Sequence, residues 1–368
     1  MKETHFKALK PLCPVCLVRQ GRSEALSIGT IERAADEDIL EGTLTCPNQA
    51  CGSVYPIIDG IPILVADLAR YMQEHAHEIL WRNDLSPKLQ SCIGDALGAG
   101  VVFDTNRHYL SAYVDGHYRD FDQRLAEDTP IAPVMQLVDG MSNELLSKQS
   151  GHRIDLGCSV GRASFELAAS RPNELVLGVD LNFTKLRFAR SMLTKAPQSY
   201  PRKRVGVVYD HHTVQLPTRY DTTNLDFWAC DAAGPPFSPE SFGLALSLNL
   251  LDCVASPTAH LDSLRTILQT TGYAYVATPF DWSAPVTPMD AWLGGHSQHN
   301  EWRGESSDIL FETLKVLRGA DGSRLVMKSE QDLPWEVRLH QRNTAVYQCL
   351  LLELQKAGPL SDDTGAHS

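Results

Sequence analysis

The stretch Ile154-Asp-Leu-Gly-Cys-Ser-Val-Gly-Arg162 decides the fold. Gly157 and Gly161 let the backbone turn sharply and approach a ligand closely, and the helix that follows would offer free N–H groups at its start. Ser159, a small residue, stands between the two glycines. The spacing differs from the Gly-x-Gly-x-x-Gly of dinucleotide-binding folds. The stretch therefore predicts a strand, a ligand-binding loop and a helix.

Outward from this loop, residues 151–356 alternate short apolar runs with amphipathic segments. This alternation is typical of a parallel sheet covered by helices, so we expect an α/β domain there. The predicted strands are Arg153–Leu156, Leu175–Asp180, Asp226–Ala229, Leu244–Leu248, Tyr273–Ala277, Arg324–Lys328 and Ala345–Leu351. Residues 357–368, which include Gly and Ser, are expected to form a disordered tail.

Acidic residues stand at or just after the ends of three successive predicted strands: Asp155, Asp180 and Asp231. A carboxylate in the position of Asp180 can accept hydrogen bonds from both hydroxyls of a ribose. A single acid after a strand is usually a cap or a solvated loop residue. Three acids in register with a glycine loop predict a nucleoside-binding edge of the sheet.

The segment Asp155-Leu-Gly-Cys-Ser-Val-Gly161 resembles motif I of the class I S-adenosylmethionine-dependent methyltransferases, with Ser159 where that family has its middle glycine. The resemblance implies a Rossmann-like α/β fold with a seven-stranded sheet and S-adenosylmethionine as cofactor. It implies a ribose contact for Asp180 and an adenine contact for Asp231. The cofactor residues that it implies are Asp155, Gly157, Ser159, Gly161, Asp180, Leu181, Asp231, Ala232 and Asn249. A nicotinamide enzyme, which uses a similar loop, stays open as an alternative.

Four of the nine cysteines cluster near the start of the chain: Cys13, Cys16, Cys46 and Cys51. Each short-spaced pair can place two thiolates on one tight turn, and two such turns can close a tetrahedral Zn²⁺ site. The N-terminus lacks the apolar core of a signal peptide, which favours a cytoplasmic location and metal ligands over disulfides. Residues 1–67 therefore predict a small domain with a structural zinc ion, although four unliganded cysteines stay possible.

The segment Val54–Val65 predicts a strand, a turn at Asp59-Gly60 and a second strand. A zinc ribbon that ends in this way resembles the zinc-binding activator of tRNA and translation-factor methyltransferases. In that family the ribbon is a separate subunit that covers an apolar face of a methyltransferase, so the resemblance implies a covalently attached partner here. Residues 68–150 are expected to form a helical linker or lid beside the substrate site, with helices over Leu68–Asn83 and Ala132–Lys148.

The fourth predicted strand ends in Leu248-Asn-Leu-Leu-Asp252, without the (Asn/Asp)-Pro-Pro-(Tyr/Phe) motif of amino-methylating enzymes. With Trp292-Leu-Gly-Gly295, Leu333–Arg338 and an upstream element at Tyr113 and His117-Tyr118, it resembles the C-terminal methyltransferase domain of ovothiol synthase. That domain methylates an imidazole nitrogen of 5-thiohistidine. The iron-dependent domain of ovothiol synthase has no counterpart in this sequence, and that enzyme lacks the ribbon, so the substrates can differ.

The resemblance implies an N-methyltransferase that acts on the imidazole of a small histidine-derived molecule, of the 5-thiohistidine (ovothiol) type or its selenium analogue. The candidate catalytic residues are Asn249, Asp252, Tyr113, His117, Tyr118 and Arg338. We expect Asn249 and Asp252 to orient the ring, the aromatic residues to cap it, and the arginine to hold a carboxylate. A structural role as helix cap, junction packing or ion pair stays open for each.

Charge and hydropathy limit the kinds of partner that the chain can bind. The net charge of −12 disfavours nucleic acid as the main partner, and no apolar run is long enough to span a bilayer.

Two rival functions stay open. The chain could methylate an rRNA or tRNA base, with the ribbon recognising RNA and Tyr200–Arg204 as the basic cluster of note. It could also be a non-catalytic zinc-ribbon interaction protein. The oligomeric state is not indicated by the sequence.

Overall fold

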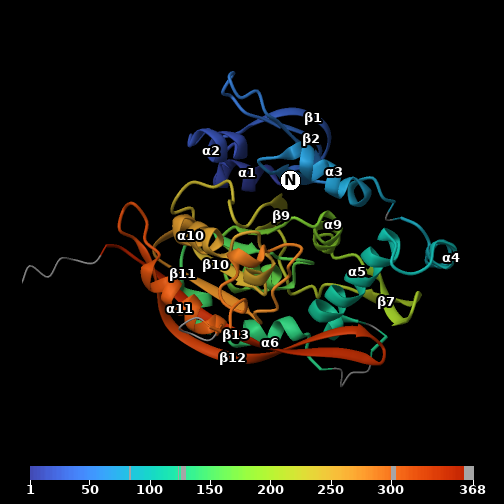
Figure 1. Cartoon of the computed structure of the whole chain (residues 1–368). Helices are drawn as coiled ribbons and strands as arrows, with labels where there is room; N and C mark the ends of the chain where they lie inside the picture. The colour runs from blue at the N-terminus through green and yellow to red at the C-terminus, as the bar shows by residue number, and fades with distance from the viewer. Residues whose placement is uncertain (83, 123, 126–129, 300–303, 360–368) are drawn as a thin grey trace, which may run out of the picture.

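The computed structural model describes residues 1–82, 84–122, 124–125, 130–299 and 304–359. Asn83, the last residue of one predicted helix, and residues 360–368 of the predicted tail lie outside this set. One eleven-stranded sheet runs through the described part in the order β1-β2-β3-β4-β9-β6-β5-β10-β11-β13-β12, and a β7–β8 hairpin stands apart from it (Figure 1).

The strands follow the chain in this order: β1 Ser27–Ala35, β2 Asp38–Thr45, β3 Val54–Ile58, β4 Ile61–Leu64, β5 Arg153–Leu156, β6 Val176–Asp180, β7 Gln198–Val205, β8 Val208–Val214, β9 Leu225–Cys230, β10 Phe242–Leu248, β11 Leu268–Thr278, β12 Arg324–His340 and β13 Asn343–Ala357. The helices are α1 Glu3–Leu9, α2 Pro14–Gln20, α3 Leu68–Ile79, α4 Pro87–Leu97, α5 Val102–Tyr118, α6 Pro133–Asp139, α7 Asn143–Lys148, α8 Arg162–Ser170, α9 Phe183–Met192, α10 Pro257–Ile267 and α11 Ser306–Val316.

Seven of these strands form an α/β sheet in the order β9-β6-β5-β10-β11-β13-β12, which confirms the seven-stranded Rossmann-like prediction. β5, β6, β9, β10 and β11 run parallel, and β13 is antiparallel to β11 and β12. All residues of β5 and β9 are buried, because helices cover both faces of the sheet. Strand order reverses between β5 and β10, and ligands of open α/β sheets bind at such a switch point.

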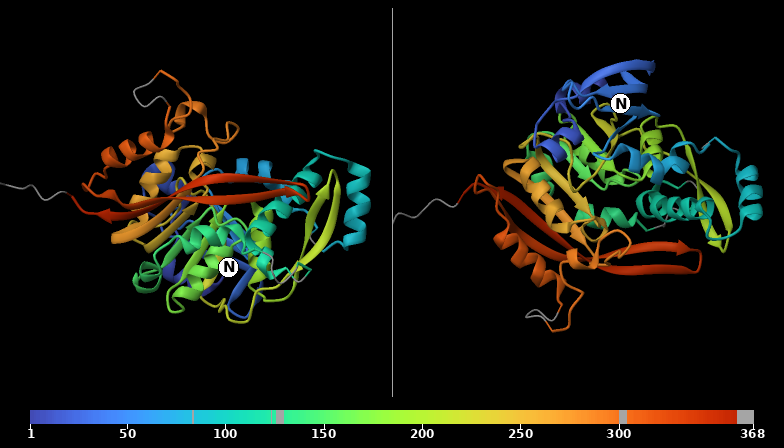
Figure 2. Two further views of the ribbon diagram at one scale, coloured as in Figure 1. Left: turned by 90° about the horizontal axis from the view of Figure 1, so that it is seen from below. Right: turned by 45° about the horizontal axis from the view of Figure 1, so that its top comes forward.

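The last two strands are much longer than predicted. β12 and β13 pair from Arg324 with Ala357 to His340 with Asn343. Their outer half extends past the sheet and packs against α5 and β7 (Figure 2). The predicted strand Ala345–Leu351 lies in this half, whereas its partner Leu333–His340, which alternates apolar and polar residues and is mostly half-buried, was not predicted.

One helix prediction in the segment 68–150 is wrong. Ala132–Lys148 is not one helix: α6 ends before Gly140, and the Ser142 hydroxyl accepts the N–H of Leu145 at 3.3 Å to begin α7. The stretch Val102–Tyr118, which carries the aromatic cluster, is a helix of 17 residues within the segment expected to be helical, although its bounds were not predicted. No helix in the described ranges is long and apolar enough to cross a membrane.

The N-terminal cysteine-bearing segment is continuous with the sheet. β3 and β4 pair around Asp59-Gly60 as predicted, and β4 then pairs in parallel with β9 through Ile63–Ala229 and Leu64–Cys230. In Figure 1 this segment lies above the edge of the sheet that β9 would otherwise leave open. The pairing satisfies backbone groups that an edge strand exposes. The antiparallel strands β1–β4 therefore continue the sheet beyond β9.

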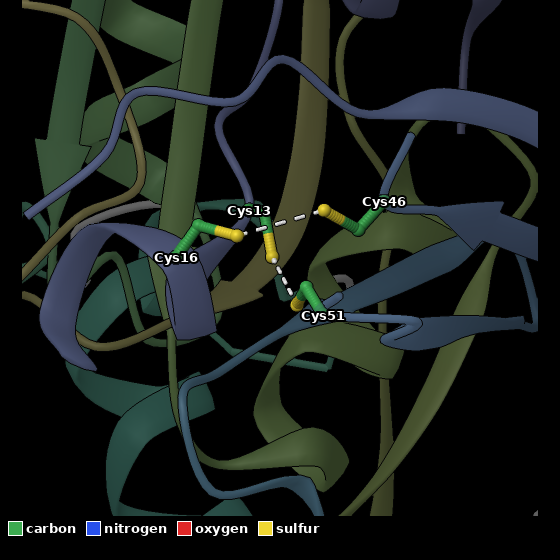
Figure 3. Close-up of side chains that lie close together, drawn as sticks. All are labelled: Cys13, Cys16, Cys46 and Cys51. Carbon is green, nitrogen blue, oxygen red and sulfur yellow. Dashed lines mark hydrogen bonds between the residues drawn. The ribbon is translucent and has the colours of Figure 1, made fainter. Parts of the chain in front are cut away.

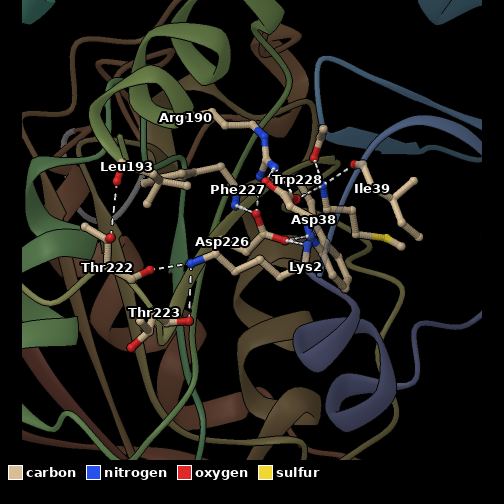
Figure 4. A network of polar contacts seen from close by, with 12 residues as sticks. Lys2, Asp38, Ile39, Arg190, Leu193, Thr222, Thr223, Asp226, Phe227 and Trp228 are labelled. Atoms are coloured by element: carbon tan, nitrogen blue, oxygen red, sulfur yellow. Dashed lines mark hydrogen bonds and ion pairs between the residues drawn. The ribbon is translucent and has the colours of Figure 1, made fainter. Parts of the chain in front are cut away.

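A buried carboxylate holds this junction together (Figure 4). Asp226, at the start of β9, is fully buried and accepts hydrogen bonds from the Lys2 N–H at 2.8 Å and the Trp228 indole at 2.9 Å. Arg190 of α9 pairs with Asp226 at 2.5 Å and also with Asp38 of β2. Burial alone would raise the pKa of Asp226, but the N-terminal ammonium and Arg190 outweigh it and hold that pKa well below its usual range.

Arg190 also explains the glycine of the β3–β4 turn. Gly60 has a φ of +76°, and a Cβ at this position would lie 2.2 Å from Nε of Arg190. A larger residue would thus both strain the backbone and displace the guanidinium. The Asp59-Gly60 turn is therefore needed for the contact between the N-terminal segment and α9.

Asp226→Asn removes the charge that balances Arg190 in this junction. We expect the free energy of unfolding at pH 7 to fall by about 3 kcal/mol, because breaking a buried ion pair leaves an uncompensated charge. The folded-state pKa of Asp226 is depressed, so its stabilisation is present above the unfolded pKa of about 4 and is lost as the pH falls below it. Urea denaturation at pH 7 and at lower pH measures both effects.

The matched control is Asp36→Asn, in the exposed turn between β1 and β2, where a φ of +53° suits asparagine. It should leave the free energy of unfolding within about 0.5 kcal/mol of the parent value. Equal stabilities of the two variants would show that the Asp226 network does not hold the junction.

Candidate active site and metal centre

The loop between β5 and α8 has the left-handed geometry that its glycines predict. φ is +74° at Gly157, +54° at Ser159 and +91° at Gly161. A Cβ on Gly161 would lie 2.7 Å from the ring of Phe227, which is on the adjacent strand β9. The loop therefore fits closely against the sheet, and the first turn of α8 begins beside it.

Asp180 ties the end of β6 to this loop. One carboxylate oxygen accepts the N–H of Ser159 at 2.9 Å, and the other accepts the N–H of Asn182 at 2.8 Å. Asn182 in turn caps α9 by accepting the N–H of Lys185 at 2.9 Å. Leu181, between them, is 38% exposed and remains accessible to a ligand. Asp180 is thus held in place, half-buried, beside the glycine loop.

Asp155 and Tyr118 support the loop from inside the protein. The Asp155 carboxylate accepts the Ser164 hydroxyl at 2.6 Å, and burial raises its pKa to about 7. Tyr118 is fully buried and donates its hydroxyl to the carbonyl oxygen of Val160 at 2.7 Å. Both residues fix the shape of the loop from within the core.

At the end of β9, Asp231 is exposed and accepts the N–H of Ala233 at 2.9 Å. The carbonyl of the buried Ala232 accepts Nδ1–H of His260 at 2.9 Å, and Nε2 of that ring accepts the Ser247 hydroxyl at 2.8 Å. His260, which the sequence analysis missed, thereby fixes the segment next to Asp231. Only the fold brings it there from α10.

Two polar side chains at the end of β10 carry unused hydrogen-bonding atoms. Asn249 has a φ of +52°, and both amide atoms are buried with only the weakly hydrogen-bonding Cys349 thiol beside them in the described residues. Asp252 is 2% exposed; one of its oxygens accepts the N–H of Asp281 at 2.7 Å, and no described group bonds the other. Burial raises the pKa of the Asp252 carboxyl. Unsatisfied buried atoms at a switch point indicate a ligand.

The side of the site opposite β10 is lined by α5, α9 and β13. The ammonium of Lys185 lies 3.4 Å from the ring centroid of Tyr113. Burial, the adjacent Asp281 and the neighbouring Tyr113 and Asp252 raise the pKa of Tyr347. Lys185 and Tyr347 thus accompany Tyr113 beside Asp252. Neither belongs to a motif in the sequence.

His117 lies one helical turn after Tyr113 on α5. It is 6% exposed, its ring meets the edge of Trp335 at 6.5 Å, and its Nδ1 has no hydrogen-bond partner among the residues that the structure describes. Burial, with Lys185 and Arg162 nearby, lowers the pKa of His117 to about 3. The imidazole is therefore neutral at physiological pH.

Arg338 stands away from this group, with Arg119 and Arg202 around the buried Asp115. Asp115 pairs with Arg119 at 3.0 Å and with Arg202 at 2.8 Å. Arg338 donates Nη2–H to the carbonyl of Lys203 at 3.1 Å, whereas its Nη1 lacks a partner within the described ranges. The structure thus brings together Asn249, Asp252, Tyr113 and His117, and it places Arg338 in a neighbouring arginine cluster.

The four N-terminal cysteines converge on one point (Figure 3). Their sulfur atoms all lie within 4.8 Å of one another, with Cys13 and Cys51 3.8 Å apart and Cys16 and Cys46 3.7 Å apart. Tetrahedral zinc with Zn–S bonds of about 2.3 Å separates its sulfur ligands by about 3.8 Å. The cluster therefore has the donor set and spacing of a closed zinc site.

Comparisons with known proteins give one family match and several similar solved structures. Residues 154–276 match the profile of a family described as "Methyltransferase domain", whereas no curated protein matches the sequence. A similar solved structure is an S-adenosylmethionine-dependent methyltransferase of Methanosarcina mazei, 17% identical, with a TM-score of 0.38 over 57% of this chain and 94% of that one. Phosphoethanolamine N-methyltransferase 1 of Haemonchus contortus, solved with phosphoethanolamine and S-adenosylhomocysteine, is 11% identical, with a TM-score of 0.43 over 77% and 52% of the two chains.

A third structure pairs the Haloferax volcanii Trm112 methyltransferase activator with a methyltransferase; it is 15% identical, with a TM-score of 0.34 over 61% of this chain and 89% of that one. Such low scores carry no argument about function. The family match spans the strands that carry the glycine loop, Asp180, Asp231 and Asn249. The chain therefore carries a methyltransferase domain with an α/β fold over residues 154–276.

Gly161→Ala tests the cofactor loop. The added Cβ meets Phe227 and the backbone stays in a left-handed conformation, so we expect at least about tenfold weaker binding of S-adenosylhomocysteine and a lower melting temperature. Calorimetric titration and thermal denaturation measure these changes.

Gly206→Ala in the β7–β8 turn provides the control. Its φ of +55° imposes similar strain, but no heavy atom lies within 4 Å of the added Cβ. It should cost about 1 kcal/mol of stability and leave cofactor affinity unchanged. If both glycine variants bind the cofactor equally well, the loop at Gly161 does not contribute to the cofactor site.

Proposed function

We propose that the enzyme transfers a methyl group from S-adenosylmethionine to an imidazole nitrogen of a small histidine-derived molecule, of the 5-thiohistidine type or its selenium analogue. The observation that carries this proposal is the pair of unsatisfied polar side chains, Asn249 and Asp252, at the end of β10. A neutral imidazole offers one N–H donor and one lone pair. The free oxygen of Asp252 can accept that N–H while the other ring nitrogen is left to attack.

In this proposal the cofactor lies across the carboxyl ends of β5, β6 and β9. Asp180 would receive the ribose hydroxyls, and the edge formed by Asp231 and Ala232 would receive the adenine. The residues present fit this assignment, since Asp180 is already oriented by Ser159 and Asn182, and His260 holds Ala232. When bound, S-adenosylmethionine supplies an electrophilic methyl group on a positively charged sulfur.

In this proposal, side chains of the protein position the acceptor and stabilise the charge that develops on it. Asp252 fixes the imidazole tautomer and stabilises the positive charge that develops on the ring as it is alkylated. The Asn249 amide, which has only the Cys349 thiol beside it in the described residues, can orient a second polar group of the acceptor. The ring proton that is lost afterwards can leave through Asp252, because burial raises the pKa of this carboxyl above its usual range.

The aromatic residues have different parts in the proposal. Tyr113 and the neutral His117 would line the acceptor site, with the unpartnered Nδ1 of His117 free to meet a polar atom of the substrate. Tyr118 would act as a positioning residue for the glycine loop through Val160 and would not touch the ring. Arg338 keeps an unpartnered Nη1 among the described residues, so in this proposal it would hold a substrate carboxylate that reaches from the acceptor site to the arginine cluster.

A base of RNA is less well supported as the acceptor. The basic run Tyr200–Arg204 forms β7, where Arg202 pairs with Asp115 at 2.8 Å and Arg204 pairs with Asp210. Lys203 lies above the ring of Tyr209. These side chains are engaged within the protein and leave little free charge for phosphates. The rival function as a non-catalytic interaction protein is disfavoured by the ordered glycine loop and its oriented acids.

We also propose that Cys13, Cys16, Cys46 and Cys51 hold a structural zinc ion. The site is closed by four sulfurs, and neighbouring polar groups can bond to the thiolates: the Asn48 amide lies 3.7 Å from Cys16, and the Ser53 hydroxyl lies 3.1 Å from Cys51. Four cysteine ligands leave no open position for catalysis, so the metal would supply folding energy.

Asp252→Asn tests the proposed role of the carboxylate. One amide atom can still accept the N–H of Asp281, but the NH₂ would oppose the imidazole N–H, so kcat for the acceptor should fall at least about 100-fold. Cofactor affinity should stay within about threefold. In the parent enzyme, kcat should fall on acidification at a pH above the usual range of aspartate, because burial raises the pKa of Asp252.

The assay follows methyl transfer by mass spectrometry with 5-thiohistidine, its selenium analogue, histidine, carnosine and an rRNA fragment. Asp290→Asn, an exposed acid on the loop that follows β11, serves as the matched control and should retain full activity. A gain of one methyl on an imidazole supports the proposal. Methylation of RNA alone, or full activity of Asp252→Asn, would contradict it.

The zinc proposal makes a separate prediction. The purified protein should contain about one zinc ion per chain, and Cys46→Ser should lower both the metal content and the melting temperature, because metal binding is coupled to folding. Metal analysis and thermal denaturation measure these effects. Cys92→Ser, at an exposed position on α4, should change neither. A metal-free parent protein with unchanged stability after Cys46→Ser would refute a structural zinc site.

A further inference from the structure

A cavity of about 190 Å³ lies between α5, α9, the β7–β8 hairpin and the segment that joins α3 to α4. Its wall includes Trp81 and Phe103, whose rings stack with centroids 5.1 Å apart and planes inclined by 17°. Phe188 and Leu110 add further apolar surface. The cavity is therefore suited to a flat apolar group.

Arg107 brings a buried charge into this cavity. It lines the cavity although it is only 5% exposed, and its Nε and Nη2 are buried without a hydrogen-bond partner in the part of the chain that the structure describes. Its guanidinium stacks on Tyr209, 4.1 Å from the ring centroid, but forms no ion pair with a described carboxylate. The nearby Asp104 is engaged instead by the Tyr209 hydroxyl at 2.8 Å and the N–H of Gly100 at 3.2 Å.

An unpaired buried guanidinium is costly, whereas an anion that accepts two of its N–H groups compensates it well. The other arginines of the cavity are already satisfied. Arg187 donates to Asp59 and to two backbone carbonyls, and Arg82 pairs with Asp84 through two nitrogens. His211 adds another donor or acceptor, since its buried Nε2 is also unpartnered among the described residues. The polar end of the cavity is thus built for an anion.

The cavity is separate from the cofactor and acceptor residues. None of the residues proposed to contact S-adenosylmethionine or the imidazole lines it. It does border the same two helices: Thr184 and Leu110 line the cavity, while Lys185 and Tyr113 face the acceptor side. An occupant would therefore contact both helices that carry the acceptor-side residues without entering the active site.

We propose that this cavity is a second ligand site, which binds a small molecule that joins one anionic group, such as a carboxylate, to a flat apolar ring. The anionic group bonds to Nε and Nη2 of Arg107 and to His211. The ring lies against Trp81 and Phe103. This site is independent of the identity of the methyl acceptor.

Benzoate and its neutral analogue benzamide test the proposal on the full chain saturated with S-adenosylhomocysteine. Calorimetric titration should give a Kd for benzoate of about 1 mM or tighter, and benzamide should bind at least about tenfold more weakly because it lacks the charge. Benzoate should also change the fluorescence of the protein, since Trp81 forms a wall of the site. Saturation with the cofactor product keeps the cofactor site from accounting for these signals, and the Arg107→Gln variant distinguishes the cavity from the acceptor site.

Arg107→Gln should weaken benzoate binding at least tenfold and make benzoate and benzamide equivalent. Arg82→Gln is the matched control, because it removes a cavity arginine that is already paired, and it should bind benzoate as the parent does. If Arg107→Gln fails to fold, Trp81→Leu takes its place; it should weaken binding and abolish the fluorescence change. Absence of benzoate binding, equal affinities for benzoate and benzamide in the parent, or loss of binding on cofactor saturation would overturn the proposal.

Discussion

The buried carboxylate of Asp226 is the interaction on which the architecture depends. It lies where three parts of the chain meet: the N-terminal segment, α9 and β9. A fully buried charge is tolerated only where cations and N–H donors compensate it, so the position of each partner is narrowly constrained. Arg190 extends the constraint to Asp38, and Gly60 leaves room for its guanidinium. The cysteine-bearing segment is thus attached to the catalytic sheet by both charge and backbone pairing.

The sequence predicted best where local chemistry decides the structure. The glycine loop needs left-handed backbone, the buried strands need continuous apolar runs, and paired cysteines need a tight turn, so each left a recognisable pattern. Features that depend on tertiary contacts left no recognisable pattern in the sequence. The outer half of β12 leaves the rest of the sheet to pack against α5 and β7, and α5 combines buried polar and aromatic residues without a clear apolar face. Lys185 and His260 reach the site only because α9 and α10 pack beside it.

The buried polar residues of the site fall into two groups. In one group the polar atoms are hydrogen-bonded within the protein, and in the other some polar atoms have no partner among the described residues. Tyr118, Asp155 and His260 are buried with their polar atoms engaged by the protein, and they shape the loop and strand ends. Asn249 and Asp252 are also buried, yet they retain atoms with no partner among the described residues. Since proteins satisfy most buried polar groups, the second kind of residue is the better guide to where a ligand binds. Residue type alone could not make this distinction, because both groups contain strand-end polar residues.

The same sheet connects the two proposed binding functions. β4 pairs with β9 through Leu64 and Cys230, and Cys230 directly precedes Asp231, the residue assigned to the adenine edge. Without β4, β9 would be an edge strand, and its carboxyl end would lose hydrogen bonds that define its course. The proposed metal, by ordering the cysteine-bearing segment, would act on the cofactor site through this backbone ladder without contacting the ligand. This arrangement gives a physical reason for joining a small metal-binding segment to a methyltransferase in one chain.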